Sequence, residues 1–317
     1  MNSELIEVSK NTLQNCLGLK EKETFLIVTD EVKKELAEAV YEAGKSLGAE
    51  TMLVVMQERS KSGEEPPATI SKAMEHADVV LCITEHSLTH TQARKNAVKA
   101  GARLATMPGI TEDMFLEGAI AADYTQVKQL TEEVTEVLTK GKKVRIEKDG
   151  HTLEFSIAER DGVPSTGVYV NAGESGNLPS GEAYIAPMEG TGEGQIIVDG
   201  SLAGIGKLSA PVLLTVKQGR LVSAEGAEEG EQLLRMLGDG DGRNLAEFGI
   251  GTNNKARITG VVLEDEKVYG TIHVAFGSNN TFGGTVSAGV HIDGVVTKPN
   301  VYIDDVLVIK EGEYIAE

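Results

Sequence analysis

Histidines and acidic residues gather near the C-terminal end of this sequence with spacings that suit metal binding. His291 and Asp293 lie two residues apart in a segment that alternates like a β-strand, and alternate strand residues point to the same face. His273 lies in a second strand-like segment, between Gly270 and Gly277. Two imidazoles and a carboxylate leave open positions on a bound metal, as in hydrolytic zinc sites and non-haem Fe(II) sites. A metal site is therefore the leading hypothesis.

Two glutamates could enlarge this site. Glu182 opens a strand-like segment after a turn at residues 177–181, and Glu247 precedes the glycine-rich segment 248–253, which we interpret as a turn. Both carboxylates are expected at junctions of loops and strands, where a side chain can point into a cleft. Five such ligands suffice to bridge two ions about 3.5–4 Å apart, as in two-metal hydrolases. The alternative for each glutamate is a position that faces only water.

The elements that must position these residues fall into two regions. Strands are expected at 24–29, 50–56, 78–84 and 103–107, and helices at 31–48, 68–77 and 89–102. This alternation predicts a parallel sheet covered by helices on both faces. A connecting helix is expected at 122–141, and short glycine-separated strands with one helix at 230–238 follow it.

We therefore predict an α/β (Rossmann-like) N-terminal domain with a parallel sheet over residues 1–141. A mixed, mostly antiparallel α+β metal-binding domain is expected over residues 142–317.

Composition excludes several classes of function. The net charge of -19 and the absence of tryptophan argue against nucleic acid as a partner. The N-terminus has no apolar signal region, and no stretch approaches about 18 consecutive apolar residues, so we expect a cytoplasmic protein that does not bind membranes. Two cysteines are too few for a disulfide framework. These exclusions leave a small-molecule substrate as the expected partner.

Two further histidines, His86 and His90, follow the third expected strand, at the sheet edge where α/β proteins bind ligands. They could form a metal pair or belong to a substrate-facing loop. The preferred interpretation is a helix start with Ser87 or Thr89 as N-cap.

Several segments, in order and spacing, resemble the aminopeptidase T and aminopeptidase S metallopeptidases: NLPSGEAYIAPMEGTGEGQIIVDGS, LAEFGIGTN, LEDEK, GTIHVAFG and HID. In that family a dinuclear metal centre, usually zinc or cobalt, removes N-terminal residues from peptides. The resemblance implies a homodimeric metallohydrolase that uses two divalent ions (Zn, Co or Mn) and a metal-activated water. It assigns the metal ligands to Glu182, Glu247, His273, His291 and Asp293.

Two catalytic roles accompany this resemblance. Asp265 and Glu266 match an Asp-Glu pair before the first histidine, and we assign Glu266 to proton transfer or to orienting a ligand. Asn280 stands where the family has a tyrosine. An asparagine amide can donate a hydrogen bond to a developing oxyanion, but it cannot act as a phenol acid.

Two alternatives remain open. The C-terminal half also resembles the 2,5-dihydroxypyridine dioxygenases, which hold one Fe(II) with two histidines and an aspartate, a pattern that His273, His291 and Asp293 satisfy. The other alternative is a non-catalytic protein that binds a metal or a small molecule at the same place.

Overall fold

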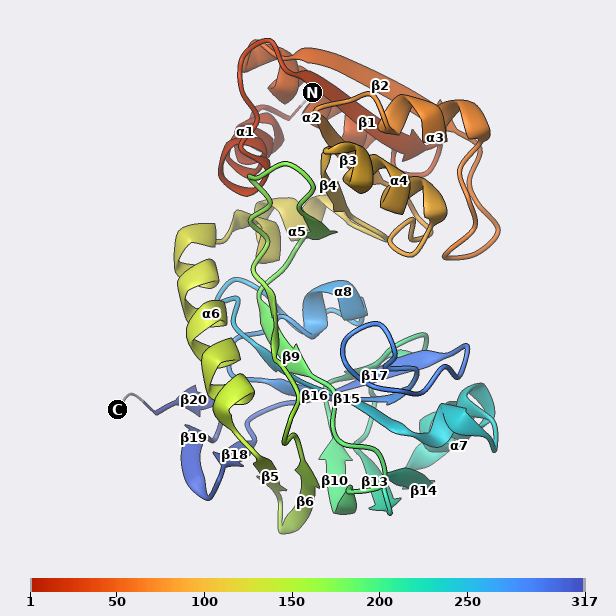
Figure 1. The fold of residues 1–317 in the computed structure, drawn as a ribbon, viewed down its shortest axis with the longest axis vertical. Coiled ribbons are helices and arrows are strands. Elements are labelled where there is room, and N and C mark those ends of the chain that lie inside the picture. The colour runs from red at the N-terminus through yellow and green to blue at the C-terminus, as the bar shows by residue number, and fades with distance from the viewer. Residues whose placement is uncertain (1, 316–317) are drawn as a thin grey trace. The chain divides into compact units, whose positions relative to one another are not determined.

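The computed structural model of this chain describes residues 2–315 and contains two compact units (Figure 1). The first unit consists of residues 2–128 and 167–180, and the second of residues 129–166 and 181–315. Helix α6 (Tyr124–Lys140) runs from the first unit into the second. The boundary predicted at residue 141 lies at the end of this helix, whose buried Val134 and Leu138 already belong to the core of the second unit.

The first unit is built on a five-stranded sheet of order β2-β1-β3-β4-β8, in which every pairing is parallel. Its strands are β1 (Thr24–Asp30), β2 (Glu50–Met56), β3 (Val79–Ile83), β4 (Arg103–Thr106) and β8 (Ser175–Asn177). The predicted α/β domain with a parallel sheet is confirmed. Strand β8 was not predicted, because the segment Ser-Gly-Asn has no apolar or β-branched residue to mark it as a strand.

Helices cover both faces of this parallel sheet (Figure 1). They are α1 (Ser3–Leu17), α2 (Lys34–Ser46), α3 (Ala68–Met74), α4 (Gln92–Ala100), α5 (Glu112–Leu116) and the 3-10 turn η1 (Ala119–Ala121). On one face, Leu26 and Val28 pack in a core that includes Met74 of α3 and Ala97 of α4. Their neighbours Phe25 and Ile27 are also fully buried, as expected for a central parallel strand.

The second unit contains two antiparallel sheets. The eight-stranded sheet has the order β14-β13-β10-β6-β5-β18-β19-β20, and the seven-stranded sheet has the order β12-β11-β17-β16-β15-β9-β7. The strands of the first are β5 (Lys143–Lys148), β6 (His151–Ser156), β10 (Glu193–Val198), β13 (Val212–Lys217), β14 (Arg220–Glu225), β18 (Asn300–Ile303), β19 (Val306–Lys310) and β20 (Glu313–Tyr314). Those of the second are β7 (Val163–Ser165), β9 (Glu182–Ile185), β11 (Ser201–Leu202), β12 (Gly206–Lys207), β15 (Leu245–Gly251), β16 (Ile272–Gly277) and β17 (His291–Val296).

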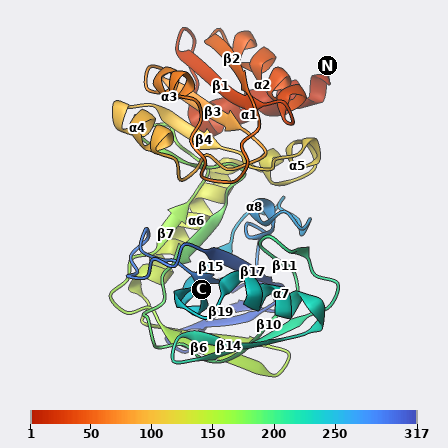
Figure 2. The ribbon, with the colours of Figure 1, turned by 90° about the vertical axis from the view of Figure 1, so that its right-hand side faces the viewer.

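The two sheets lie as stacked layers (Figure 2), with one apolar core between them. Phe155 of the eight-stranded sheet and Phe248 of the seven-stranded sheet meet edge to face, with ring centroids 5.5 Å apart. The short helices α7 (Ala227–Leu237), η2 (Asp241–Arg243) and α8 (Val262–Asp265) connect strands of this unit. The predicted mostly antiparallel second domain is thereby confirmed.

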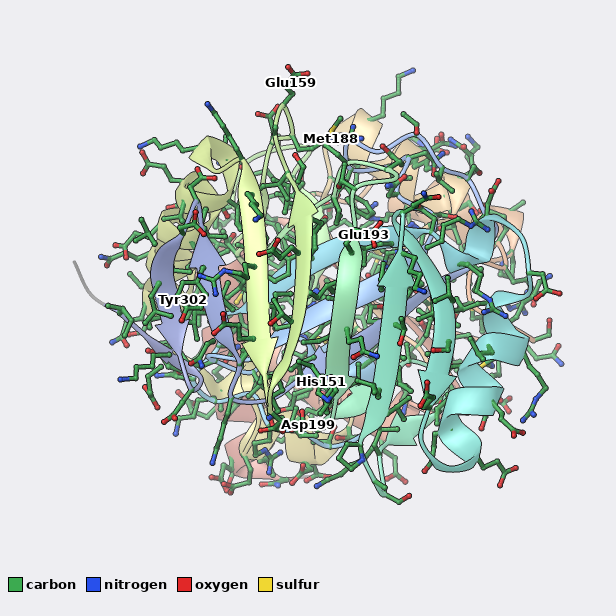
Figure 3. All side chains as sticks on the ribbon, turned by 90° about the horizontal axis from the view of Figure 1, so that it is seen from below. His151, Glu159, Met188, Glu193, Asp199 and Tyr302 are labelled. Atoms are coloured by element: carbon green, nitrogen blue, oxygen red, sulfur yellow. The ribbon has the colours of Figure 1, made fainter. Side chains whose placement is uncertain are left out.

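The outer face of the eight-stranded sheet is polar (Figure 3). His151 Nδ1 lies 3.1 Å from Gln195 Oε1, and the guanidinium of Arg145 lies 3.7 Å from the ring centroid of Tyr302. Partly exposed side chains alternate with buried ones along β5, β13 and β18, as in a sheet with one solvated face. Across the described residues, no helix combines the length and the apolar character needed to cross a bilayer.

Candidate metal centre

One face of the seven-stranded sheet brings together the five predicted ligands. Four neighbouring strands carry them: His291 and Asp293 on β17, His273 on β16, Glu247 on β15 and Glu182 on β9. The opposite face of these strands faces the core. Because side chains alternate along a strand, the apolar residues between the ligands anchor the sheet while the ligands converge on one side.

Small residues give the ligands room on this face. In the register of the sheet, Gly249 lies opposite His273, and Gly251 lies opposite Glu182. A Cβ added at Gly249 would overlap the imidazole of His273. The imidazole therefore lies across β15 in space that only a glycine leaves free.

The prediction of a turn after Glu247 is wrong, because residues 245–251 form the buried strand β15. Its glycines serve the packing of the ligands rather than a change of chain direction. The register shifts between Leu245 and Glu247, so Ala246 is an extra residue in the strand. Such a bulge turns the following side chain, and it helps to aim Glu247 at the site.

The ligand atoms lie at metal-like separations. His273 Nε2 is 3.2 Å from a Glu247 carboxylate oxygen and 3.4 Å from Glu182 Oε2. His291 Nε2 is 3.4 Å from the other Glu247 oxygen and 3.4 Å from Asp293 Oδ1. Atoms that each bind one ion at about 2.0–2.2 Å are separated by roughly 3.0–3.5 Å, whereas good N–H···O hydrogen bonds are shorter.

Two further observations fit a cation at this place. Glu182 Oε2 and His273 Nδ1 are buried atoms without a hydrogen-bond partner, and an unpaired buried carboxylate oxygen is costly unless a cation binds it. His291 Nδ1 lies 2.8 Å from the carbonyl oxygen of Ser278. Donation from Nδ1 to that carbonyl leaves the Nε2 lone pair free for a metal.

The electrostatics of the cluster favour positive charge. Burial by itself lowers the pKa of His273 and of His291, but the surrounding carboxylates raise both above the ordinary value. Burial raises the pKa of Glu247, yet its hydrogen bonds to the two imidazoles lower it by more, well below the usual range. A metal ion would take the place of the protons on the imidazoles.

Lys267 is a member of this cluster that the sequence analysis missed. Its side chain is 2% exposed, and its Nζ lies 2.6 Å from Glu182 Oε1 and also donates to Glu266. Burial lowers the pKa of Lys267, but these two carboxylates raise it by more. Lysine is among the residues most often exposed, so nothing in the sequence marked it as buried.

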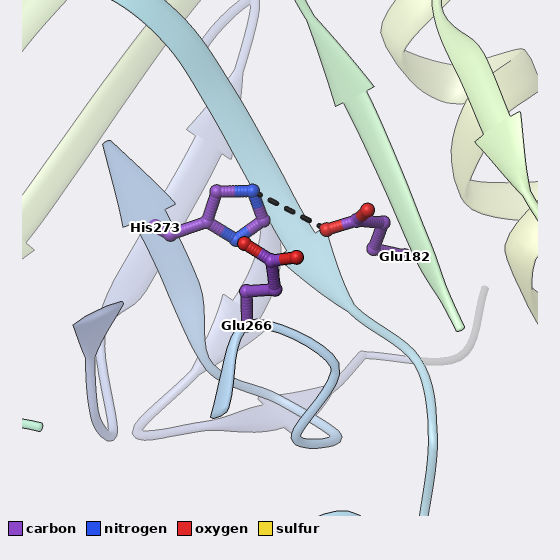
Figure 4. Close-up of side chains that lie close together, drawn as sticks. All are labelled: Glu182, Glu266 and His273. Carbon is purple, nitrogen blue, oxygen red and sulfur yellow. Dashed lines mark ion pairs between the residues drawn. The ribbon is translucent and has the colours of Figure 1, made fainter. Parts of the chain in front are cut away.

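Glu266 lies beside His273 and Glu182 (Figure 4). A carboxylate oxygen of Glu182, a carboxylate oxygen of Glu266 and an imidazole nitrogen of His273 all lie within 4.8 Å of one another. Burial raises the pKa of Glu266, and the charge of Lys267 opposes this shift. Asp265, its neighbour, points elsewhere and accepts hydrogen bonds from the backbone of Thr259 and Gly260.

Phe282, in the loop between β16 and β17 (residues 278–290), and Tyr184 of β9 form an aromatic wall at the site. The ring of Phe282 lies 6.0 Å from the imidazole of His291 and 5.4 Å from the ring of Tyr184, with both pairs close to perpendicular. The His291 side chain is 29% exposed, whereas that of His273 is fully buried. The cluster is therefore more exposed at His291 than at His273.

Two other candidates, Asn280 and His86, lie outside this cluster. Asn280 is exposed in the loop, and its recorded hydrogen bond is from its backbone N–H to Val286 O. In the first unit, His86 Nε2 lies 3.5 Å from Glu58 Oε1. The N-cap of α4 is Thr91 rather than Ser87 or Thr89, because residues 88–91 first form a turn.

Comparisons with known proteins give a consistent family. A model of the family described as "NicX: 2,5-dihydroxypyridine 5,6-dioxygenase" matches residues 4–316. A protein named 2,5-dihydroxypyridine 5,6-dioxygenase from Pseudomonas putida KT2440 is 22% identical over 265 residues, which cover 77% of this chain and 73% of that protein.

Two solved structures share the fold along nearly their whole length. The 2,5-dihydroxypyridine dioxygenase from Pseudomonas putida KT2440 superposes with a TM-score of 0.83 at 18% identity, covering 100% of this chain and 99% of the other. Wild-type AmpT from Thermus thermophilus superposes with a TM-score of 0.73 at 16% identity, covering 99% of each chain. At these identities the likeness shows the fold alone.

Proposed function

This chain belongs to the 2,5-dihydroxypyridine 5,6-dioxygenase family, and from that membership we propose that it is a metal-dependent dioxygenase that opens a hydroxylated pyridine ring. The observation that carries the proposal is the convergence of the Nε2 atoms of His273 and His291 and the carboxylate of Asp293 on one sheet face. Two histidines and one carboxylate are the ligand set of non-haem Fe(II) oxygenases.

The expectation of a metallohydrolase that acts as an aminopeptidase is wrong. The matching family and the named relative are dioxygenases, which are oxidoreductases. The likeness to AmpT is one of fold at 16% identity. The dioxygenase alternative, which His273, His291 and Asp293 also suggested, therefore replaces the metallopeptidase interpretation.

We assign the metal to His273, His291 and Asp293, with Glu247 between the two imidazoles as a further carboxylate ligand. Bound Fe(II) would supply the redox chemistry by which both atoms of O2 enter an aromatic ring. The buried sheet face excludes bulk water from one side of the ion, and the carbonyl of Ser278 holds the His291 imidazole in the tautomer that binds metal.

The aromatic wall would orient a flat substrate. Phe282 lies next to the partly exposed His291, and Tyr184 packs against Phe282. A hydroxypyridine ring placed against Phe282 would gain stacking or edge-to-face contact. A proton-transfer role for Glu266 stays a prediction, since its carboxylate pairs with the ammonium of Lys267.

The test is reconstitution under anaerobic conditions with Fe(II), followed by 2,5-dihydroxypyridine in air-saturated buffer. We expect O2 uptake together with loss of the pyridine absorbance. His273→Ala and Asp293→Asn should lose both bound iron and O2 uptake. His151→Ala is the matched control, because His151 lies on the outer face of the eight-stranded sheet (Figure 3) and should keep both.

Two results would contradict the proposal in different ways. If the protein, stripped of metal with a chelator, does not take up iron, manganese or zinc, the proposal of a metal site is wrong. Stoichiometric iron without O2 uptake on any hydroxypyridine would leave the metal site standing and remove the dioxygenase reaction.

A further inference from the structure

The buried ammonium of Lys267 lies inside a cluster that otherwise consists of acids and histidines. Its Nζ contacts one carboxylate oxygen of Glu182 and one of Glu266. A buried charge is costly unless it is paired and hydrogen-bonded, and here both conditions are met by these two carboxylates. The lysine is therefore a fixed positive charge of the site rather than a surface residue.

Two possible cation positions exist among these side chains, and they share His273. One position is bounded by Glu247, His273 and Asp293, and the other by Glu182, Glu266 and His273. Figure 4 shows the second of these groups, with both carboxylates directed at the imidazole. Lys267 binds the two carboxylates of this second group.

The backbone holds the lysine in place. Its N–H donates to Glu264 O at the end of α8, and its carbonyl accepts from the N–H of Asn253. A Cβ added at Gly251 would overlap the backbone of residues 267 and 268, so β15 and this segment approach each other closely. The backbone of Lys267 is therefore held in place, and the two carboxylates hold its ammonium.

We propose that the Lys267 ammonium occupies the cation position bounded by Glu182, Glu266 and His273, and so is the group that keeps a second divalent ion out of it. The inference rests on the proposed function only in requiring that a metal binds here. Four carboxylates face the site, from Glu182, Glu247, Glu266 and Asp293. A second ion at the position between Glu182, Glu266 and His273 would compete with the ammonium for the same two carboxylates and would have to displace it.

The experiment measures metal stoichiometry rather than activity. The purified protein is stripped with a chelator, dialysed against excess Mn²⁺ or Zn²⁺ and analysed for metal per chain. We expect the wild-type protein to saturate at one equivalent. We expect Lys267→Met to take two, because the carboxylates of Glu182 and Glu266 are then free to bind a second ion. Lys267→Arg, which keeps the charge, is the matched control and should stay at one.

A spectroscopic measurement on the wild-type protein keeps the test independent of whether Lys267→Met folds. Electron paramagnetic resonance of the Mn²⁺-loaded protein should give the six-line signal of an isolated ion, not the multiline signal of two coupled ions. Two equivalents in the wild-type protein, or one equivalent in a folded Lys267→Met, would overturn the role of Lys267 and leave the proposed function intact. No metal in the wild-type protein would overturn the proposed function itself.

Discussion

Gly249 leaves the space that the His273 imidazole occupies. The imidazole lies across β15 where a Cβ would overlap it, so Gly249→Ala must push the ring aside or shift the strand. We expect metal affinity to fall at least about tenfold although no ligand has been changed, as when groups that orient ligands are lost. Equilibrium dialysis with Mn²⁺ measures this.

Gly240→Ala is the control for this substitution, because a Cβ there meets no atom within 4 Å. Its metal affinity should equal that of the wild-type protein. Unchanged affinity in Gly249→Ala would mean that His273 does not need its present position to bind metal.

Phe282 gives a second prediction for a single residue. Phe282→Ala removes its ring contacts with Tyr184 and His291, and aromatic contacts of this kind contribute about 0.5–1.5 kcal/mol each. We expect the KM for the hydroxypyridine to rise several-fold while metal content stays the same. Phe282→Tyr, which keeps the ring, should retain most of the substrate affinity; a loss of bound metal in Phe282→Ala would instead assign the ring to holding His291.

At this scale the sequence identified residues by type but not by burial. His273, His291 and Asp293 stood out because imidazoles and carboxylates are scarce and chemically distinct. Lys267 did not stand out, because its place in the cluster depends on Glu182, which is far away in the sequence, as well as on its neighbour Glu266. Asn280 was a candidate because it stands where the resembling family has a tyrosine. In the structure Asn280 is exposed, and its neighbour Asn279 is buried.

The loop of residues 278–290 is the element that places Phe282 beside His291, and the carboxylate of Glu189 holds this loop in place. One Glu189 oxygen accepts from the N–H of Thr285 at 2.8 Å and from the amide of Asn279 at 3.0 Å. The other pairs with Arg160 at 2.5 Å. The loop is thus held by one partly buried carboxylate.

Glu189→Gln tests this tie. Burial raises the pKa of Glu189, but its hydrogen bonds and Arg160 lower it by more, so the folded-state pKa lies below the ordinary 4.5. The stabilisation is therefore complete above that value and is lost as pH falls through the lower, folded-state pKa. We expect Glu189→Gln to lower the free energy of unfolding at pH 7 by about 1–3 kcal/mol, as for other charged hydrogen bonds.

Urea unfolding at pH 7 and near pH 3 measures this difference, which should shrink at the lower pH. Glu159→Gln makes the same change of charge at an exposed position and should have no such effect. A difference that is the same at both pH values would assign the effect to packing rather than to the charge of Glu189.

At the scale of elements, the sequence predicted what periodicity can report. The alternating strands and helices of residues 24–107 each have a clear apolar pattern, and the structure contains them. The segment after Glu247 resembles a turn because it contains two glycines, and glycine is common in turns. In the structure these glycines belong to β15, and Gly249 leaves space for the imidazole of His273 on β16, which the local sequence does not show. Strand β8 depends likewise on a distant partner, β4.

For the whole molecule, the two units have separate apolar cores, and all the predicted ligands belong to the second unit. A metal ion that binds only the folded protein stabilises it by RT ln(1 + [L]/Kd), about 2.7 kcal/mol at 100 times the Kd.

Because the proposed metal-binding residues come from four adjacent strands, metal should suppress opening of β9, β15, β16 and β17 in particular. Hydrogen exchange of the intact chain, with Mn²⁺ and with a chelator, should therefore show slower exchange in these strands and little change in β1, β3 and β4. Equal slowing in both units would mean that the metal acts through the whole molecule and not through the sheet that carries its ligands.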